Sequence, residues 1–146
     1  MEQNKQPLKP EPAYRSRLKA EKANELYIKI IEKLTREKLY RDPNYNTLKL
    51  AADLQTNTRY ISAAVAVCTG NNYSALVNSL RLRDVMKMMH SAQYNQMTIE
   101  EIGLMAGFSS RQAFYLAFHR VYHCTPRAYR LQLERLKGKD EHEKFS

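Results

Sequence analysis

The stretch "TIEEIGLMAGFSSRQAFYLAFHRV", residues 98–121, predicts two short helices joined by a tight turn. Thr98 is placed to cap the first helix, and Glu101, three residues later, completes a capping box. Gly107 falls in the turn, and Ser110 can cap the second helix. Apolar residues in the second helix recur every three or four positions, on one side only. This is the pattern of a helix-turn-helix, a motif that can present the outer face of its second helix to the major groove of DNA.

A similar pattern occurs earlier in the chain, over residues 46–68. Asn46 and Asn57 can cap its two helices, which are joined by the turn "QTN". In both motifs a small residue, Ala51 or Gly103, lies in the first helix, where two helix axes must cross closely. The sequence therefore predicts two helix-turn-helix motifs in one chain.

The rest of the chain also predicts helices, and no segment has the pattern of a strand. The predicted fold class is all-α, with about seven helices in two helix-turn-helix lobes joined by a linker helix. We expect a flexible N-terminal lead-in at 1–18 and a charged flexible tail at 137–146. Between them we expect the first lobe at 19–73, the linker helix at 74–93 and the second lobe at 94–136. The first lobe begins with an amphipathic helix that ends at about Tyr40, and the last helix of the second lobe ends near Leu136.

Composition narrows the function of this 146-residue chain. Its net charge is +9 and its pI about 9.6, which favours a polyanionic partner such as nucleic acid. The chain has neither a run of apolar residues long enough for a membrane span nor a secretory signal. Its two cysteines and four histidines lack metal-ligand spacing. We expect a cytoplasmic, nucleoid-associated protein that is not an enzyme, with no metal, no cofactor and no membrane partner.

The linker length allows a geometric test of a DNA-binding function. A helix over residues 74–93 would be about 30 Å long. Successive major grooves on one face of B-DNA are about 34 Å apart. A single chain is therefore expected to place two recognition helices in adjacent grooves as a monomer.

Residues 43–133 resemble the DNA-binding domain of the AraC/XylS family of bacterial transcription regulators. The strongest resemblance is over residues 98–130, where the family signature is matched by Ile102, Gly107, Phe108, Phe114, Phe118, Thr125, Pro126, Tyr129 and Arg130. It implies a two-lobed domain of seven helices that binds double-stranded DNA and controls promoters, with activation the commoner role. RNA polymerase or a sensor protein would be a further partner.

The resemblance also implies which residues face DNA. The base-contact positions are Arg59, Ser62 and Ala63 in the first recognition helix, and Arg111, Gln112, Ala113, Tyr115 and Leu116 in the second. Arginine can make a bidentate contact to guanine, and glutamine can do the same to adenine. Phosphate contacts suit the capping residues and nearby basic side chains: Asn57, Ser110, His119, Arg120 and Arg127. By the same resemblance, Arg81 pairs helices and does not contact DNA.

The chain departs from the family pattern mainly in its first lobe. Ala63 and Ala66 stand where the family often has basic residues, so "SAAVAV" offers little to a base edge or a phosphate. In the second lobe, Leu116 replaces a usual arginine, and His123 replaces a glycine in a turn that favours positive φ. We therefore expect recognition helix 110–121 to carry most of the specificity, and helix 57–68 to contribute less.

An alternative interpretation is a protein–protein interaction module with only non-specific affinity for DNA. In that case the amphipathic helix at 19–40 would bind a sensor protein, RNA polymerase or a second copy. A third interpretation is the output domain of a longer sensor-regulator.

Overall fold

The computed structural model describes residues 13–144, with side chains described for residues 19–140. Within that range it contains seven α-helices, two short 3-10 helices and no strand, which confirms the predicted fold class. In chain order these are α1 (Ala13–Arg36), η1 (Leu39–Arg41), α2 (Thr47–Asp53), α3 (Thr58–Thr69), α4 (Tyr73–Met89), η2 (Ala92–Tyr94), α5 (Ile99–Ala106), α6 (Arg111–Tyr122) and α7 (Pro126–Lys144).

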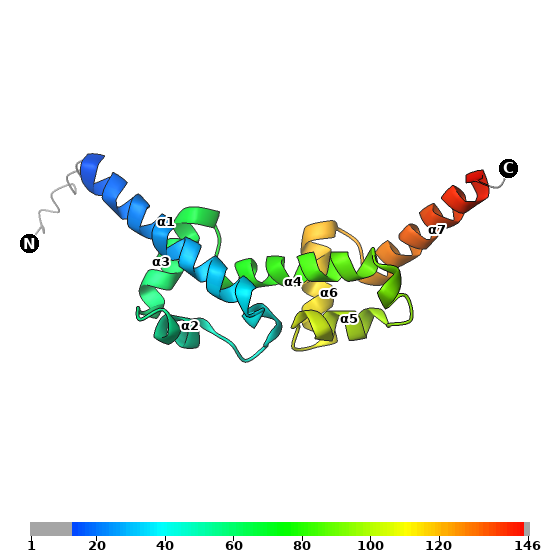
Figure 1. Ribbon diagram of the computed structural model, residues 1–146, viewed down its shortest axis with the longest axis horizontal. Coiled ribbons are helices and arrows are strands. Elements are labelled where there is room, and N and C mark those ends of the chain that lie inside the picture. Colours follow the sequence, from blue (N-terminus) through cyan, green and yellow to red (C-terminus); the bar gives the residue numbers. More distant parts are fainter. Residues whose placement is uncertain (1–12, 145–146) are drawn as a thin grey trace, which may run out of the picture.

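Two lobes lie side by side along the long axis of the molecule (Figure 1). The first contains α1, α2 and α3, and the second contains α5, α6 and the start of α7. Helix α4 runs along the long axis and joins them, while α3 and α6 both cross this direction. Helices α1 and α7 extend from opposite ends of the molecule.

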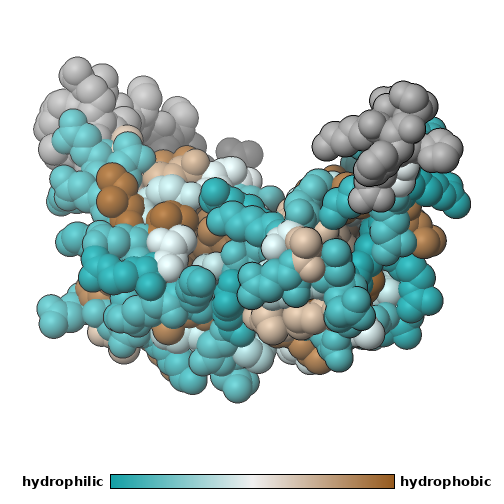
Figure 2. All heavy atoms as spheres, turned by 45° about the vertical axis from the view of Figure 1, so that its right-hand side comes forward, coloured by the Kyte–Doolittle hydropathy of each residue, from teal (hydrophilic) through white to brown (hydrophobic). Residues whose placement is uncertain are grey.

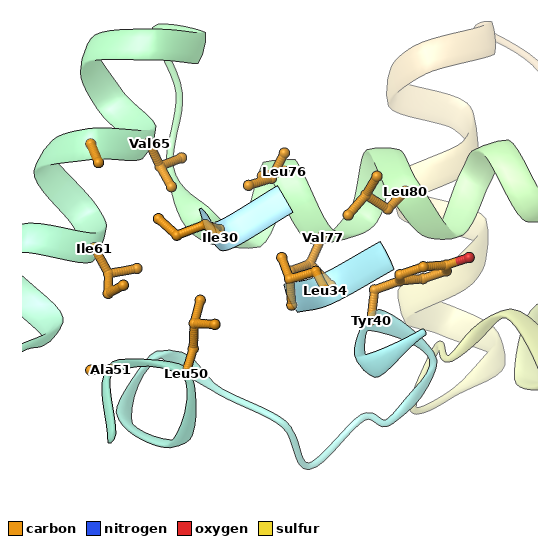
Figure 3. Close-up of a cluster of buried hydrophobic side chains, with 11 residues drawn as sticks. Ile30, Leu34, Tyr40, Leu50, Ala51, Ile61, Val65, Leu76, Val77 and Leu80 are labelled. Carbon is orange, nitrogen blue, oxygen red and sulfur yellow. The ribbon is translucent and has the colours of Figure 1, made fainter. Parts of the chain in front are cut away.

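The core of the first lobe is formed by α1, α2, α3 and the first half of α4 (Figure 3). Ile30 and Leu34 of α1 meet Leu50 of α2 and Ile61 and Val65 of α3, and all five side chains are fully buried. Burial of an aliphatic side chain of this size contributes about 1.5–3 kcal/mol. Helix α1 is therefore an integral part of this lobe, because it closes the core over α2 and α3.

The core of the second lobe is aromatic. Phe114 and Phe118 of α6 are buried, and their rings meet edge to face with centres 6.0 Å apart. Both pack in one cluster with Ile102 of α5 and Val85 of α4. Gly103 makes room for this arrangement, because a Cβ atom at position 103 would lie 2.2 Å from the ring of Phe114. The small residue expected at this helix crossing thus accommodates a phenylalanine ring.

A buried polar cluster joins the two lobes. The carboxylate of Asp84 in α4 accepts hydrogen bonds from the Tyr40 hydroxyl at 2.6 Å and from Arg41 Nε at 2.8 Å. Burial, followed by the hydrogen bond to Asp84, raises the pKa of Tyr40. Arg81 Nε donates to the Tyr40 carbonyl oxygen at 2.6 Å, and its guanidinium lies 5.6 Å from the centre of the Phe108 ring. Arg81 thus pairs structural elements, as the family resemblance implies.

Gly107 completes the contact between the lobes. It ends α5 with φ 113°, and a Cβ atom there would lie 2.5 Å from both the Arg41 Cα and the Tyr40 carbonyl oxygen. Only glycine allows this approach of the second lobe's turn to η1 of the first lobe.

Several helix boundaries differ from those expected. Helix α1 begins at Ala13, not near Lys19, and ends at Arg36, before the expected Tyr40. Residues 1–12 of the predicted lead-in lie outside the described residues. Helix α7 continues to Lys144 and does not end near Leu136, so most of the predicted flexible tail is helical. The lysines and glutamates of the tail are good helix formers, and they extend a helix already anchored by packing.

The linker helix is shorter than predicted. Helix α4 has 17 residues and ends at Met89, which makes it about 25 Å long instead of 30 Å. The segment that follows is held in a turn by Arg130, whose guanidinium donates to the carbonyl oxygens of Met97, Tyr94 and Asn95 at 2.5–3.2 Å. Helical periodicity in the sequence does not reveal this contact, because Arg130 comes from α7.

Candidate nucleic-acid interface

Side-chain caps fix the start of both recognition helices. Asn57 Oδ1 accepts from the Tyr60 amide at 2.9 Å before α3, and Ser110 Oγ accepts from the Ala113 amide at 3.1 Å before α6. Each cap keeps a donor, the Asn57 amide group or the Ser110 hydroxyl, at the exposed start of its helix. The helix dipole adds partial positive charge at the same place.

The predicted residues on the outer side of α6 share one hollow. This hollow has a volume of about 550 Å³ and is lined by Gln112, Tyr115, Leu116, His119, Arg120 and Thr125. Four of the five α6 residues are exposed, and Tyr115 is half-buried. The structure therefore brings together most of the base and phosphate candidates of the second lobe on one surface.

Arg111 and Arg127 lie beside an acidic residue, Glu100 of α5. Arg111 Nε and Arg127 Nη2 are each 3.6 Å from the same Glu100 oxygen, and the Tyr115 hydroxyl donates to this oxygen at 3.2 Å. The Arg111 guanidinium also lies over the Tyr115 ring, 5.0 Å from its centre. Of the base candidates on α6, Ala113 lies half-buried on the first turn.

The charge of Glu100 is favoured by its surroundings. A hydrogen bond from its own backbone, the Tyr115 hydroxyl and the charges of Arg111 and Arg127 together lower the pKa of Glu100. Sequence reasoning missed this residue, because it belongs to the helix before the recognition helix and meets Arg111 only across the turn. Its one sequence signal is an acidic residue in the first turn of α5.

The three candidates on α3, at positions i, i+3 and i+4, lie on one helix face, but they do not line a common hollow. Arg59, Ser62 and Ala63 are all exposed. Ser62 lines a polar hollow of about 520 Å³ next to the starts of α2 and α4. Ala63 lines a different, mainly apolar groove of about 570 Å³ between α1 and α3, and Arg59 lines neither.

The two recognition helices also differ in charge. Arg59 is the only charged residue of α3, whereas α6 carries Arg111, Arg120 and His119. The groove beside α3 is instead bordered by exposed apolar side chains, including Tyr60 and Val67. The face shown in Figure 2 is mostly hydrophilic, with hydrophobic patches over the first lobe.

Two further expectations concern histidines and membranes. His123 ends α6 with φ 58° and ψ 23°, so the turn keeps positive φ although glycine is absent. His90 Nε2 lies 3.1 Å from the Tyr129 hydroxyl.

Among the described residues there is no cluster of three potential metal ligands, and no helix that is long and apolar enough to cross a membrane.

Comparison with protein families decides the identity of this two-lobed structure. The helix-turn-helix domain family matches residues 50–132, more than half of the chain and a span that runs from α2 into α7. The chain belongs to the AraC-type helix-turn-helix DNA-binding domain family. Searches of the curated proteins and of the solved structures gave no match.

This AraC-type domain is a DNA-binding domain for transcriptional regulation, and its family is not one of enzymes. The family match begins after α1 and η1. Those two elements nevertheless supply Ile30 and Leu34 to the first core, and Tyr40 and Arg41 to the contact between the lobes. The segment before the family match is therefore structurally part of the domain.

Proposed function

We propose that the protein is a sequence-specific transcription regulator that inserts α3 and α6 into adjacent major grooves of double-stranded DNA. Helix α4, about 25 Å long, joins the lobes that carry α3 and α6 and is shorter than the 34 Å between successive grooves. The polar cluster around Asp84 holds the lobes on this strut. One chain then carries two recognition helices, which supports binding as a monomer.

Most of the specificity resides in α6. Arg111 reads guanine and Gln112 reads adenine through bidentate hydrogen bonds, while Ala113 and Leu116 contact thymine methyl groups and Tyr115 packs at the base edge. Phosphates are bound by the exposed side chains of His119, Arg120 and Arg127, and at the capped helix starts by Asn57 and Ser110. The observation that carries this proposal is the single hollow that gathers five of the α6 candidates, one of which, Tyr115, lies under the Arg111 guanidinium.

Helix α3 contributes affinity more than sequence reading. Arg59 is its only side chain able to make a bidentate contact to guanine. Ser62 can hydrogen-bond to a base without strong preference, and Ala63 can only touch a methyl group or a sugar. The first lobe therefore holds the duplex through its shape, Arg59 and the amides at the start of α3.

The regulatory role that we propose is activation, as the family resemblance implies, with RNA polymerase or a sensor protein as the second partner. The apolar groove between α1 and α3 supports a protein partner, because Tyr60 and Val67 are exposed beside it. A pure interaction module with non-specific DNA affinity is the second candidate function, and the same groove favours it.

Selection of binding sites from random duplex DNA, followed by footprinting, tests the proposal. We expect one strongly specified block of base pairs, flanked about one helical turn away by a protected segment of weak sequence preference. Binding should weaken steeply with salt, because phosphate contacts release counterions. A selection that enriches no sequence would contradict the regulator and favour the interaction module.

A further inference from the structure

We infer that Glu100 is a specificity-determining positioning residue: it orients Arg111 toward a base edge and reduces the attraction of Arg111 and Arg127 for phosphates. This inference rests on the proposed function, since it concerns how α6 reads DNA. Glu100 would not itself need to touch the duplex.

The geometry leaves the reading edge of Arg111 available. Glu100 approaches the Nε atom of Arg111, so the two terminal Nη groups are left for the bidentate contact that guanine accepts. The 3.6 Å between Glu100 Oε1 and Arg111 Nε is an ion-pair distance, longer than a hydrogen bond. Glu100 therefore orients the guanidinium without fixing it in one position.

Tyr115 supports the same guanidinium from a second direction. Its ring lies under Arg111, and its hydroxyl donates to the Glu100 oxygen that faces both arginines. Tyr115 is in turn fixed edge to face against buried Phe114, with ring centres 5.9 Å apart. The orientation of Arg111 is therefore transmitted from the core of the second lobe to its surface.

Charge explains why Glu100 would favour arginine contacts to DNA bases over contacts to DNA phosphates. One carboxylate faces two cations, so Arg111 and Arg127 together present about one net positive charge instead of two. The carboxylate repels a negatively charged phosphate beside these arginines, whereas the edge of guanine is neutral and is repelled much less. The lowered pKa of Glu100 means that the carboxylate is ionised at neutral pH.

The test compares four variants, Glu100→Ala, Glu100→Gln, Arg111→Ala and the double variant Glu100→Ala/Arg111→Ala. Fluorescence anisotropy would measure their binding to the selected duplex, to duplexes with single base-pair changes, and to a random duplex, at several salt concentrations. We expect Glu100→Ala to reduce discrimination at the base pair read by Arg111 about tenfold. It should also strengthen binding to the random duplex and steepen its salt dependence by about one phosphate contact.

Three comparisons separate positioning from simple charge or folding effects. In the Arg111→Ala background, Glu100→Ala should cause no further loss of discrimination. Glu134→Gln removes the same charge from an exposed carboxylate in α7 that has no ion pair within the described residues, and it should leave discrimination unchanged. Glu100→Gln keeps the shape of the side chain without its charge, so it should reproduce the gain in non-specific binding.

The possible failures are distinguishable. If Arg111→Ala loses discrimination but Glu100→Ala keeps it in full, the inference is overturned and the proposed function stands. If Arg111→Ala keeps discrimination at every position, both the inference and the assignment of Arg111 as a base reader are overturned. Thermal unfolding followed by circular dichroism would verify that each variant is folded at the temperature of the titrations.

Discussion

The two lobes share one scaffold and differ in the surface that it presents. Each recognition helix starts at a side-chain cap, Asn57 or Ser110, and each motif has a small residue at its helix crossing, Ala51 or Gly103. On α6, polar and basic residues gather in one hollow, whereas the α3 candidates line no common hollow and include one charged residue, Arg59. The difference teaches that the fold and the chemistry of base recognition vary independently. Helix caps and helix crossings determine the fold, whereas the side chains on the outer faces of α3 and α6 determine which bases can be recognised.

Breaking the contact between the lobes should have the largest effect. In Gly107→Ala, the new Cβ would clash with backbone atoms of residues 40 and 41, at a φ of 113° that alanine rarely adopts. Strain and overpacking together should lower the free energy of unfolding by about 3–5 kcal/mol. Urea denaturation followed by circular dichroism measures this change.

Gly138→Ala is the matched control for that substitution. A Cβ at position 138, within α7, meets no atom within 4 Å, so it should stabilise the protein by up to about 1 kcal/mol. An unchanged urea midpoint for Gly107→Ala would show that the lobes do not depend on this contact.

The helix crossing offers a second, smaller perturbation. Gly103→Ala places a methyl group against the Phe114 ring, and the resulting overpacking should outweigh the gain in helix propensity. We expect a net loss of about 1–2 kcal/mol in the second lobe. Combining it with Phe114→Leu should recover part of this loss in the same denaturation assay. If the two substitutions are simply additive, the ring does not account for the glycine.

A gain-of-contact variant should sharpen the difference between the recognition helices. Ala66 is exposed on α3, where the family often has a basic residue. Ala66→Arg should strengthen binding to any duplex and steepen the salt dependence by about 0.9, the value for one additional phosphate contact. Titrations of a random duplex at several salt concentrations measure this salt dependence. An unchanged slope of log affinity against log salt concentration would indicate that this face of α3 points away from DNA.

The sequence was sufficient for those features that depend on neighbouring residues. The caps at Asn46, Asn57 and Ser110 and the capping box at Thr98 are confirmed, because each depends on residues within one helical turn. The turn at the end of α6 has positive φ at His123, the position where the family has glycine.

The features that sequence reasoning missed depend on residues far apart in the chain. Tyr40 and Asp84 are 44 positions apart, and no local pattern indicates their hydrogen bond. Arg130 in α7 holds the turn that follows α4, and the cluster around Glu100 joins three helices. Helix periodicity predicts which face is buried, but it does not reveal which polar groups meet. The base and phosphate contacts themselves stay predictions.

The most direct test of the central claim compares Arg59→Ala with Arg111→Ala in parallel binding-site selections. The account predicts that Arg111→Ala loses preference at one base pair, worth about 1–3 kcal/mol, while Arg59→Ala weakens binding with a smaller change in the selected sequence. Equal losses of sequence preference, or a loss confined to Arg59→Ala, would contradict the conclusion that the second lobe reads and the first lobe holds.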